Sequence, residues 1–292
     1  MDMKLRRSML FIPGNNPGML QNGGVFGADS VILDLEDAVA PSEKDAARFL
    51  IAHALRTVDY GCSEKVIRIN PLDTFAAEDI KAVVPCHPDA ILVPKVESAE
   101  DIHTAVQMIA AAEQPDQTPV KIIALLETPR GILEAYNIAK ADPRVVALAL
   151  GAEDYTAGLG AMRTKEGTEI FTARTILVNA AAAAGVQSID TPYTDANDEE
   201  GLLADTELAK RLGFKGKLSI NPRQIDVIHS VFNPSISDID WAEQVIHAIR
   251  KAEAEGSGVA SLNGKMVDLP IVNRAERILH LARLLGLIEG AK

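Results

Sequence analysis

The sequence predicts an eight-stranded α/β barrel of the (β/α)8 TIM type, followed by a C-terminal helical extension. Eight short apolar runs recur at near-regular intervals along the 292 residues, and helical patterns separate them. The runs are hydrophobic throughout rather than alternating, as parallel strands are when both faces are buried. Most runs also end in a polar or charged residue. This predicts one shared polar surface at the carboxyl ends of the strands, where the active site of such a barrel lies.

The expected strands and helices follow in order from these runs. The strands span 8–13, 30–37, 65–70, 90–96, 121–128, 145–155, 188–193 and 216–222. One helix between them begins at Ser42, with Asp45 three residues later, and another begins at Ser98. Each of these is a capping signal ahead of a one-sided apolar stripe. The residues expected at the polar ends of the strands are Glu36, Asp37, Arg68, Lys95, Glu127, Asp154, Asp190 and Asn221.

Two domains are expected, a catalytic barrel at 1–232 and a helical extension at 233–292. Asn233-Pro234 breaks the chain after the last barrel helix. The extension shows a helical pattern at 238–255, a turn at Asn263-Gly264 and an amphipathic helix at 271–287. We expect it to contribute to the active site and to contacts between subunits.

Composition argues against several classes of protein. The net charge of −12 and the pI near 5.0 disfavour nucleic-acid binding, since no dense run of Lys and Arg offsets them. No stretch reaches the ~18 uncharged apolar residues that span a bilayer. The basic start at 1–7 leads into a strand rather than a signal core, so we expect a cytoplasmic protein. Cys62 and Cys86 lie apart from each other and from any His cluster, which disfavours a disulfide or a zinc site.

Glu127 and Asp154 are candidate metal ligands. They end neighbouring runs, and parallel strands lie ~4.8 Å apart, so their oxygens could reach one ion. Two hard oxygen ligands with room for water and substrate suit Mg²⁺ or Mn²⁺ better than zinc. The alternative is that each is a solvated loop carboxylate or the partner of a nearby arginine.

Glu36, Asp37 and Arg68 are candidate catalytic or substrate-binding residues. Arg68 alternates with apolar residues in VIRIN, which turns its guanidinium toward the barrel interior, where it needs an anionic partner. That partner is either a substrate carboxylate or a protein carboxylate, Glu36 or Glu127. Glu36 and Asp37 would pair with Arg68, Lys95 or metal-bound water, unless Asp37 caps the following turn.

Lys95 admits two chemistries. A lysine on a barrel strand can act as a Schiff-base nucleophile if burial lowers its pKa. Among so many carboxylates, the side chain is expected instead to stay protonated as the partner in an ion pair.

Seven segments make the sequence recognisable when taken together. They are RRSMLFIPG (6–14), LDLEDAV (33–39), RIN (68–70), GAEDY (151–155), GTEIFTAR (167–174), LGFKGKLSINPRQI (212–225) and SLNGKMVDLPI (261–271). In order and extent they resemble the citrate lyase β-subunit family, within the HpcH/HpaI aldolase and acyl-CoA lyase group. The resemblance runs from Arg6 almost to the C-terminus.

The resemblance implies the same barrel, a divalent metal, and cleavage of citryl-ACP or citryl-CoA to an acetyl thioester and oxaloacetate. It places the metal, and with it the substrate, on Glu127 and Asp154, and a substrate carboxylate on Arg68. It also makes Asp268 an acid or base, often supplied across a subunit boundary. Glu36 is the other candidate for handling the proton.

The resemblance further implies a phosphopantetheine or CoA carrier for the acyl group. Arg7, Pro13 and Gly14, around the glycine-rich turn after the first strand, are candidates for holding its phosphates; a simple strand-to-helix connection explains that turn equally well. Expected partners are an acyl carrier protein, a transferase subunit and further copies in a homotrimer or hexamer. Candidate residues for a basic docking patch are Lys4, Arg6, Arg7, Lys215 and Lys217.

Other functions stay open. The segments LVPKVES (92–98) and LLETPRG (125–131) resemble those of stand-alone acyl-CoA lyases. The substrate is then alternatively malyl-CoA or citramalyl-CoA. A Schiff-base aldolase that uses Lys95, and a non-catalytic structural subunit, are two further alternatives.

Overall fold

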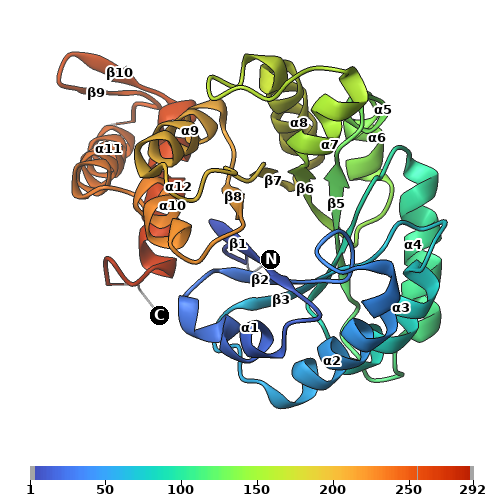
Figure 1. Cartoon of the computed structure of the whole chain (residues 1–292). Coiled ribbons are helices and arrows are strands. Elements are labelled where there is room, and N and C mark those ends of the chain that lie inside the picture. The colour runs from blue at the N-terminus through green and yellow to red at the C-terminus, as the bar shows by residue number, and fades with distance from the viewer. Residues whose placement is uncertain (1–3, 255, 290–292) are drawn as a thin grey trace. The chain divides into compact units, whose positions relative to one another are not determined.

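A computed structural model describes residues 4–254 and 256–289 of the chain, and its barrel is built from parallel strands (Figure 1). The strands are β1 (Ser8–Pro13), β2 (Ser30–Asp34), β3 (Glu64–Arg68), β4 (Ala90–Val93), β5 (Lys121–Leu126), β6 (Val145–Leu150), β7 (Gln187–Asp190) and β8 (Gly216–Ser219). They pair in sequence order, and β1 also pairs with β8, so that the sheet closes on itself. The predicted fold class is therefore confirmed.

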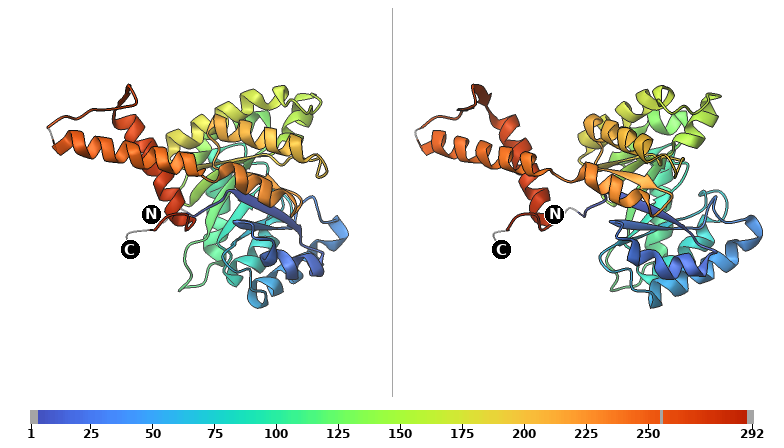
Figure 2. Two further views of the ribbon diagram at one scale, coloured as in Figure 1. Left: turned by 90° about the vertical axis from the view of Figure 1, so that its left-hand side faces the viewer. Right: turned by 60° about the vertical axis from the view of Figure 1, so that its left-hand side comes forward.

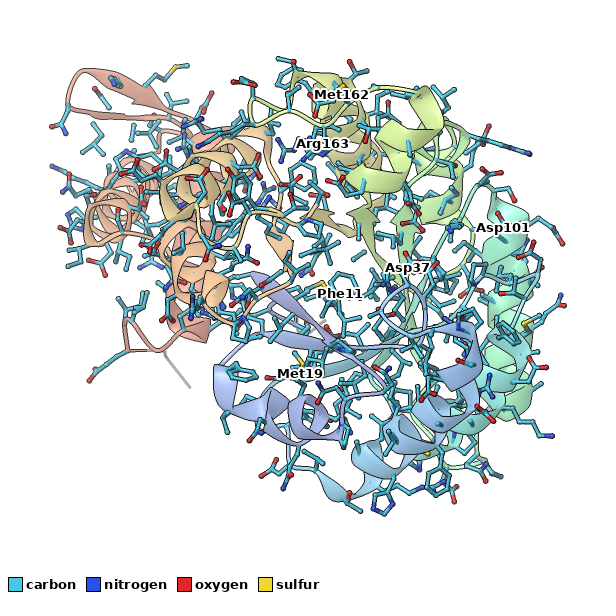
Figure 3. All side chains as sticks on the ribbon, in the orientation of Figure 1. Phe11, Met19, Asp37, Asp101, Met162 and Arg163 are labelled. Atoms are coloured by element: carbon cyan, nitrogen blue, oxygen red, sulfur yellow. The ribbon has the colours of Figure 1, made fainter. Side chains whose placement is uncertain are left out.

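Alternate residues of the strands fill the barrel with a buried apolar cluster. Its members are Met9, Ile32, Val66, Ala90, Leu92, Ile123, Leu125, Ala147, Ala149, Ile189 and Leu218. Phe11, labelled inside the ring of strands in Figure 3, packs against them. Because side chains two residues apart share a face of a strand, the next inward positions after Ile32, Val66 and Leu125 are Asp34, Arg68 and Glu127. The apolar interior therefore ends in charged groups at the carboxyl ends of the strands.

Helices cover the outside of the barrel (Figure 1). They are α1 (Pro17–Asn22), α2 (Lys44–Thr57), α3 (Ala76–Val83), α4 (Ala99–Ala112), α5 (Pro129–Leu133), α6 (Ala135–Lys140), α7 (Ala152–Leu159), α8 (Phe171–Ala184), α9 (Glu199–Leu212) and α10 (Gln224–Phe232). Ser98 caps α4 in a capping box with Asp101, as predicted. The cap predicted at Ser42 is wrong, because a 3₁₀ turn at Pro41–Glu43 precedes α2, which has no side-chain cap.

Three buried charges and the partly buried Asp205 connect β7 and β8 to the helices outside them. Asp190 accepts hydrogen bonds from Arg174 of α8 at 2.9 and 2.8 Å and from Lys217 of β8 at 2.6 Å. Asp205 of α9 accepts from the same two cations at 2.7 and 2.6 Å. The expectation that Lys217 belongs to a basic docking patch is wrong, because its side chain is 0% exposed.

The chain divides into two compact units, residues 1–229 and 230–292. The second unit contains α11 (Ile236–Ala254), β9 (Ala260–Leu262), β10 (Lys265–Val267) and α12 (Leu269–Leu284). Figure 2 shows α11 (orange) and α12 (red) crossing each other, and they share a buried cluster that includes Ile239, Val245 and Leu279. The turn predicted at Asn263-Gly264 joins β9 to β10. Glu255, the expected last residue of the first helix, lies outside the described residues.

Nowhere in the described ranges is a helix long and apolar enough to cross a membrane. The longest helix, α11, has 19 residues, and charged side chains recur along it.

The four-charge cluster around Asp190 predicts a pH-dependent effect of Asp205→Asn. Burial raises the pKa of Asp205, but the charges of Lys217 and Arg174 outweigh it and hold the pKa below its usual value. We expect the substitution to lower the free energy of unfolding by about 3 kcal/mol at pH 7, since it leaves two buried cations to one anion. This difference should shrink as the pH falls below about 3.9, where the carboxyl of the unfolded chain becomes protonated.

Urea unfolding from pH 7 to pH 3 measures this difference. Glu207→Gln, on the same helix but in an exposed pair with Arg211 at 3.5 Å, is the control and should change little. A difference that did not vary with pH would contradict the prediction.

Candidate active site

Arg68 and Asp34 form a largely buried ion pair at the carboxyl ends of β3 and β2. The two residues are register partners on these neighbouring strands. Arg68 donates to both carboxylate oxygens of Asp34, from Nε at 2.7 Å and from Nη2 at 2.6 Å. Its guanidinium also lies 4.7 Å from the centre of the Phe11 ring. Burial alone would lower the pKa of Arg68, but the bond to Asp34 and the surrounding carboxylates raise it above its ordinary value.

Glu36 is a buried carboxylate without a hydrogen-bond donor. Its Oε2 lies 3.0 Å from Arg68 Nη1, an ion-pair distance, yet neither carboxylate oxygen accepts a hydrogen bond from any described residue. Lys44 holds the main chain in place by donating to the carbonyls of Leu35 and Glu36 at 2.7 and 2.6 Å. Burial raises the pKa of Glu36 to about 7. Asp37, labelled in Figure 3, is 65% exposed and 3.9 Å from Arg68.

Glu127 follows β5 and is fixed by the main chain around it. The amide of Lys95 donates to Glu127 Oε1 at 2.8 Å. The other oxygen, Oε2, lies against Gly151, where a Cβ would come within 2.6 Å of it. Burial raises the pKa of Glu127 to about 8, and the charge of Glu36 adds to the effect. The glycine therefore leaves room for this carboxylate.

Asp154 lies in the first turn of α7. The expectation that it ends the strand of the sixth run is wrong, because β6 stops at Leu150 and the helix begins at Ala152. No side chain caps this helix start, and the sequence signal for it was the acidic pair Glu153 and Asp154 in the first turn. Asp154 Oδ2 nevertheless lies 3.7 Å from Lys95 Nζ, which places it beside the same group of charges.

Lys95 Nζ lies between two carboxylates, 3.7 Å from Glu36 Oε1 and 3.7 Å from Asp154 Oδ2. Burial alone would lower its pKa, but Glu36, Asp154 and Glu127 outweigh that effect and raise it. A protonated amine is not a nucleophile. The geometry therefore favours the ion pair over the Schiff base.

The residues present fit a divalent cation. In residues 4–254 and 256–289, no three His, Cys, Asp or Glu side chains gather closely enough to hold a metal by themselves. Two observations still support a cation here: the orphaned oxygens of buried Glu36, and the space that Gly151 leaves at Glu127 Oε2. Glu127 and Asp154 would hold a hard ion such as Mg²⁺, and water or substrate would complete its coordination.

The other predicted site residues make contacts that stabilise their own part of the fold. Arg7, at the opposite end of β1, donates to both carboxylate oxygens of Asp29, at 2.8 and 2.6 Å. Pro13 and Gly14 lie at the carboxyl end of β1, where the Gly14 amide donates to the carbonyl of Asp34 at 2.9 Å. Asp268 belongs to the second unit and caps α12. Its part in catalysis stays a prediction.

Asp34 is the main partner of Arg68, in place of the predicted Glu36 or Glu127. It was not predicted, because it lies inside the expected strand rather than at its end. The available signal was the spacing of LDLED, which puts residues 34 and 36 on one face.

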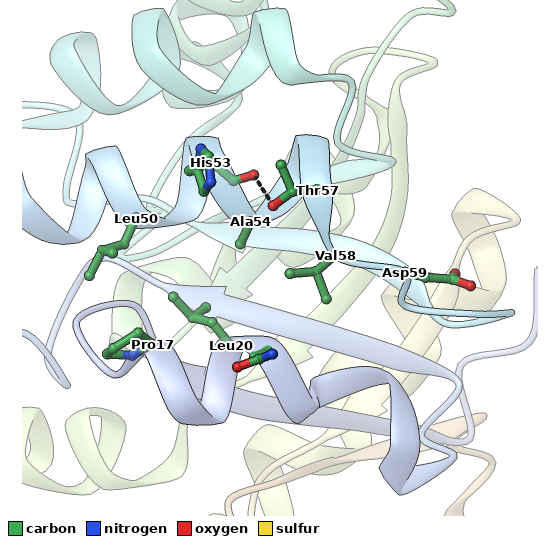
Figure 4. Close-up of a pocket in the computed structure, with 9 residues that line it drawn as sticks. Pro17, Leu20, Leu50, His53, Ala54, Thr57, Val58 and Asp59 are labelled. Carbon is green, nitrogen blue, oxygen red and sulfur yellow. Dashed lines mark hydrogen bonds between the residues drawn. The ribbon is translucent and has the colours of Figure 1, made fainter.

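A separate groove of about 450 Å³ lies between α1 and α2, on the outside of the barrel (Figure 4). Leu20, Leu50 and Val58 line it, and Asp59 is its one carboxylate. It contains none of the charged residues described above, so we assign the candidate active site to the barrel mouth.

Known proteins resemble this chain along most of its length. The sequence model of the HpcH/HpaI aldolase/citrate lyase family matches residues 7–222. Citrate lyase subunit beta of Leuconostoc mesenteroides subsp. cremoris is 47% identical over 291 aligned residues, covering 98% of this chain and 96% of the relative. A (3S)-malyl-CoA thioesterase of Cereibacter sphaeroides is 37% identical, covering 90% of this chain and 89% of the relative. The structure of protein CitE from Mycobacterium tuberculosis, in complex with magnesium, acetoacetate and coenzyme A, has a TM-score of 0.79 and 33% identity, covering 95% of this chain and 98% of that one.

The contact at Gly151 predicts that Gly151→Ala weakens binding of Mg²⁺. The new methyl group would lie 2.6 Å from both Cβ and Oε2 of Glu127 and must displace that side chain. We expect affinity to fall by about 10- to 100-fold, the usual effect of disturbing the support of a metal ligand. Calorimetric titration with MgCl2 measures it. Gly18→Ala is the control, since its nearest contact would be an ordinary 3.5 Å; equal affinities for the two variants would contradict the prediction.

Proposed function

The chain belongs to the HpcH/HpaI aldolase/citrate lyase family, and we propose that it is a Mg²⁺-dependent carbon–carbon lyase. Its substrate is a β-hydroxy acyl thioester, citryl-ACP or citryl-CoA, and its products are an acetyl thioester and oxaloacetate. One observation carries the proposal. Glu127, Asp154 and Arg68 meet at one barrel mouth, in a chain that is 47% identical to a citrate lyase subunit beta.

Arg68 binds a carboxylate of the substrate. Asp34 already occupies its Nε and Nη2, so the guanidinium keeps a fixed orientation. Nη1 faces Glu36 and the exposed Asp37 instead, and it is the donor left for an incoming anion. The pair Asp34–Arg68 thereby orients the one remaining donor of Arg68 toward the substrate carboxylate.

Glu36 is a base for the hydroxyl proton, with Asp268 as the other candidate. When the proton leaves, the alkoxide collapses to the carbonyl of oxaloacetate and the carbon–carbon bond breaks. The electron pair of that bond passes to the acetyl thioester enolate, which takes a proton at carbon from whichever of Glu36 and Asp268 is then protonated. A bound Mg²⁺ would supply charge stabilisation for the hydroxyl and carboxylate oxygens of the substrate. Glu36 suits the first step because its oxygens accept no hydrogen bond from a described residue and its pKa, about 7, is close to neutral pH.

A second candidate substrate is a malyl thioester. The observation that favours it is the 37% identity to a (3S)-malyl-CoA thioesterase over 90% of this chain. A stand-alone malyl-CoA or citramalyl-CoA lyase would use the same mouth, because both substrates carry a hydroxyl next to a carboxylate. The ratio of kcat/KM for citryl-CoA, citramalyl-CoA and malyl-CoA decides among them.

The two remaining alternatives find less support. A Schiff-base aldolase needs a neutral Lys95, which lies between carboxylates. A purely structural subunit would not need Glu127, Asp154 and Arg68 together.

The proposal includes partners. A citrate lyase β-type chain works with an acyl carrier protein and a transferase subunit, and it assembles as a homotrimer or hexamer. The extension at 233–292 would then bring Asp268 to an active site.

Oxaloacetate release from citryl-CoA, coupled to malate dehydrogenase, tests the proposed function. We expect turnover with Mg²⁺ and none with EDTA. Arg68→Lys should lower kcat/KM by about 100-fold, because lysine keeps the charge but loses the forked hydrogen bonds.

Arg144→Lys is the control for that variant. It changes an arginine that also makes two bonds to one carboxylate, at 2.8 and 3.0 Å to Glu113, but that lies at the amino end of β6. Full activity of Arg68→Lys, or turnover of citryl-CoA that persists in EDTA, would refute the proposed mechanism.

A further inference from the structure

Lys95 combines a strained backbone with a position among the acidic groups. Its φ is +52°, and His87 and Asn263 are the other described residues with a side chain and a positive φ. Residues with a Cβ adopt this left-handed conformation at a cost, and lysine has no short polar side chain to compensate locally. The hydrogen bond from its amide to Glu127 Oε1, at 2.8 Å, fixes the conformation. The same bond joins Lys95 to a candidate metal ligand.

The ammonium group is placed by charge rather than by hydrogen bonds. Its Nζ lies 3.7 Å from Glu36 Oε1 and 3.7 Å from Asp154 Oδ2, beyond the hydrogen-bond range of 2.7–3.2 Å. The side chain is 44% exposed, so solvent reaches it. The group can leave the cluster by rotating its own side chain, without moving the main chain.

The balance of charge explains why an ammonium lies there. Arg68 neutralises Asp34 through two short hydrogen bonds. Three acidic groups, the buried Glu36 and Glu127 and the more exposed Asp154, then outnumber the single ammonium of Lys95. This is the region in which a divalent cation would also be held.

We infer that the Lys95 ammonium is the counter-ion of the cation-free site and competes with the divalent cation for the same carboxylates. The inference rests on the proposed function, since it takes Glu127 and Asp154 as the metal ligands. A cation that enters must displace the ammonium from Asp154 and Glu36, and it then repels the ammonium. Lys95 therefore lowers the affinity of the site for the cation and keeps the carboxylates in place when the cation is absent.

Lys95→Met tests the inference, because methionine keeps the stem and the backbone strain and removes only the charge. Calorimetric titration with MgCl2 at fixed ionic strength should show about tenfold tighter binding than in the unmodified protein, a modest share of the interaction between a divalent and a single charge at this range. Lys95→Arg, which retains the charge, should bind as the unmodified protein does. Lys4→Met is the matched control, since Lys4 is similarly exposed (42%) and pairs with Asp89 at 2.9 Å at the other end of the barrel.

A second variant guards against misfolding. Glycine readily adopts a positive φ, so Lys95→Gly keeps the amide bond to Glu127 while it removes the ammonium, and it should also bind Mg²⁺ more tightly. Unchanged or weaker binding by both variants, when the unmodified protein does bind Mg²⁺, would overturn the inference alone. Absence of Mg²⁺ binding by the unmodified protein would overturn the proposed metal site, and the inference with it.

Discussion

Closure of the barrel forces charges of both signs into one mouth, and the rest of the site depends on how they are neutralised. The residues that follow the apolar interior on β2, β3 and β5 are Asp34, Arg68 and Glu127, so the interior ends in charges. Burying a charge without a partner is costly. Asp34 and Arg68 neutralise each other through two short hydrogen bonds. Glu127 is stabilised by a hydrogen bond from the main-chain amide of Lys95 and fits beside Gly151, which has no side chain.

One half of the site, Asp34 and Arg68, has its hydrogen bonds made within the protein, whereas Glu36 in the other half does not. The reacting groups belong to the second half. The Asp34–Arg68 pair is rigid because the two strands hold it in register. Glu36, by contrast, is 3% exposed, and neither of its oxygens accepts a hydrogen bond from a described residue. Arg68 and Lys95 offset its charge without donating a hydrogen bond, so its oxygens remain available to a cation, a proton or a substrate. A lyase that must bind an anionic hydroxy acid and move its proton needs both halves, a fixed cation for recognition and a basic carboxylate for the proton.

The sequence predicted features that are set locally, and it failed where distant contacts decide. Continuous apolar runs predicted the barrel strands, and the capping box at Ser98 predicted the start of α4, because both features depend on residues close together in the sequence. Asp34 was missed, since its role appears only when β2 lies beside β3. Asp154 was predicted to lie on a strand, because no capping residue marks the start of α7. Lys217 was predicted to lie on the surface, whereas it is buried and donates to carboxylates of β7 and α9.

Crystals soaked in Mn²⁺, with the anomalous signal of manganese recorded, would test the central claim that this mouth is a divalent-cation site. We expect one strong anomalous peak in contact with Glu127 and Asp154, and a Lys95 ammonium that has moved away from both Asp154 and Glu36. A mouth without a peak, or a manganese ion bound elsewhere while Lys95 stays between its carboxylates, would show that this mouth is not the cation site.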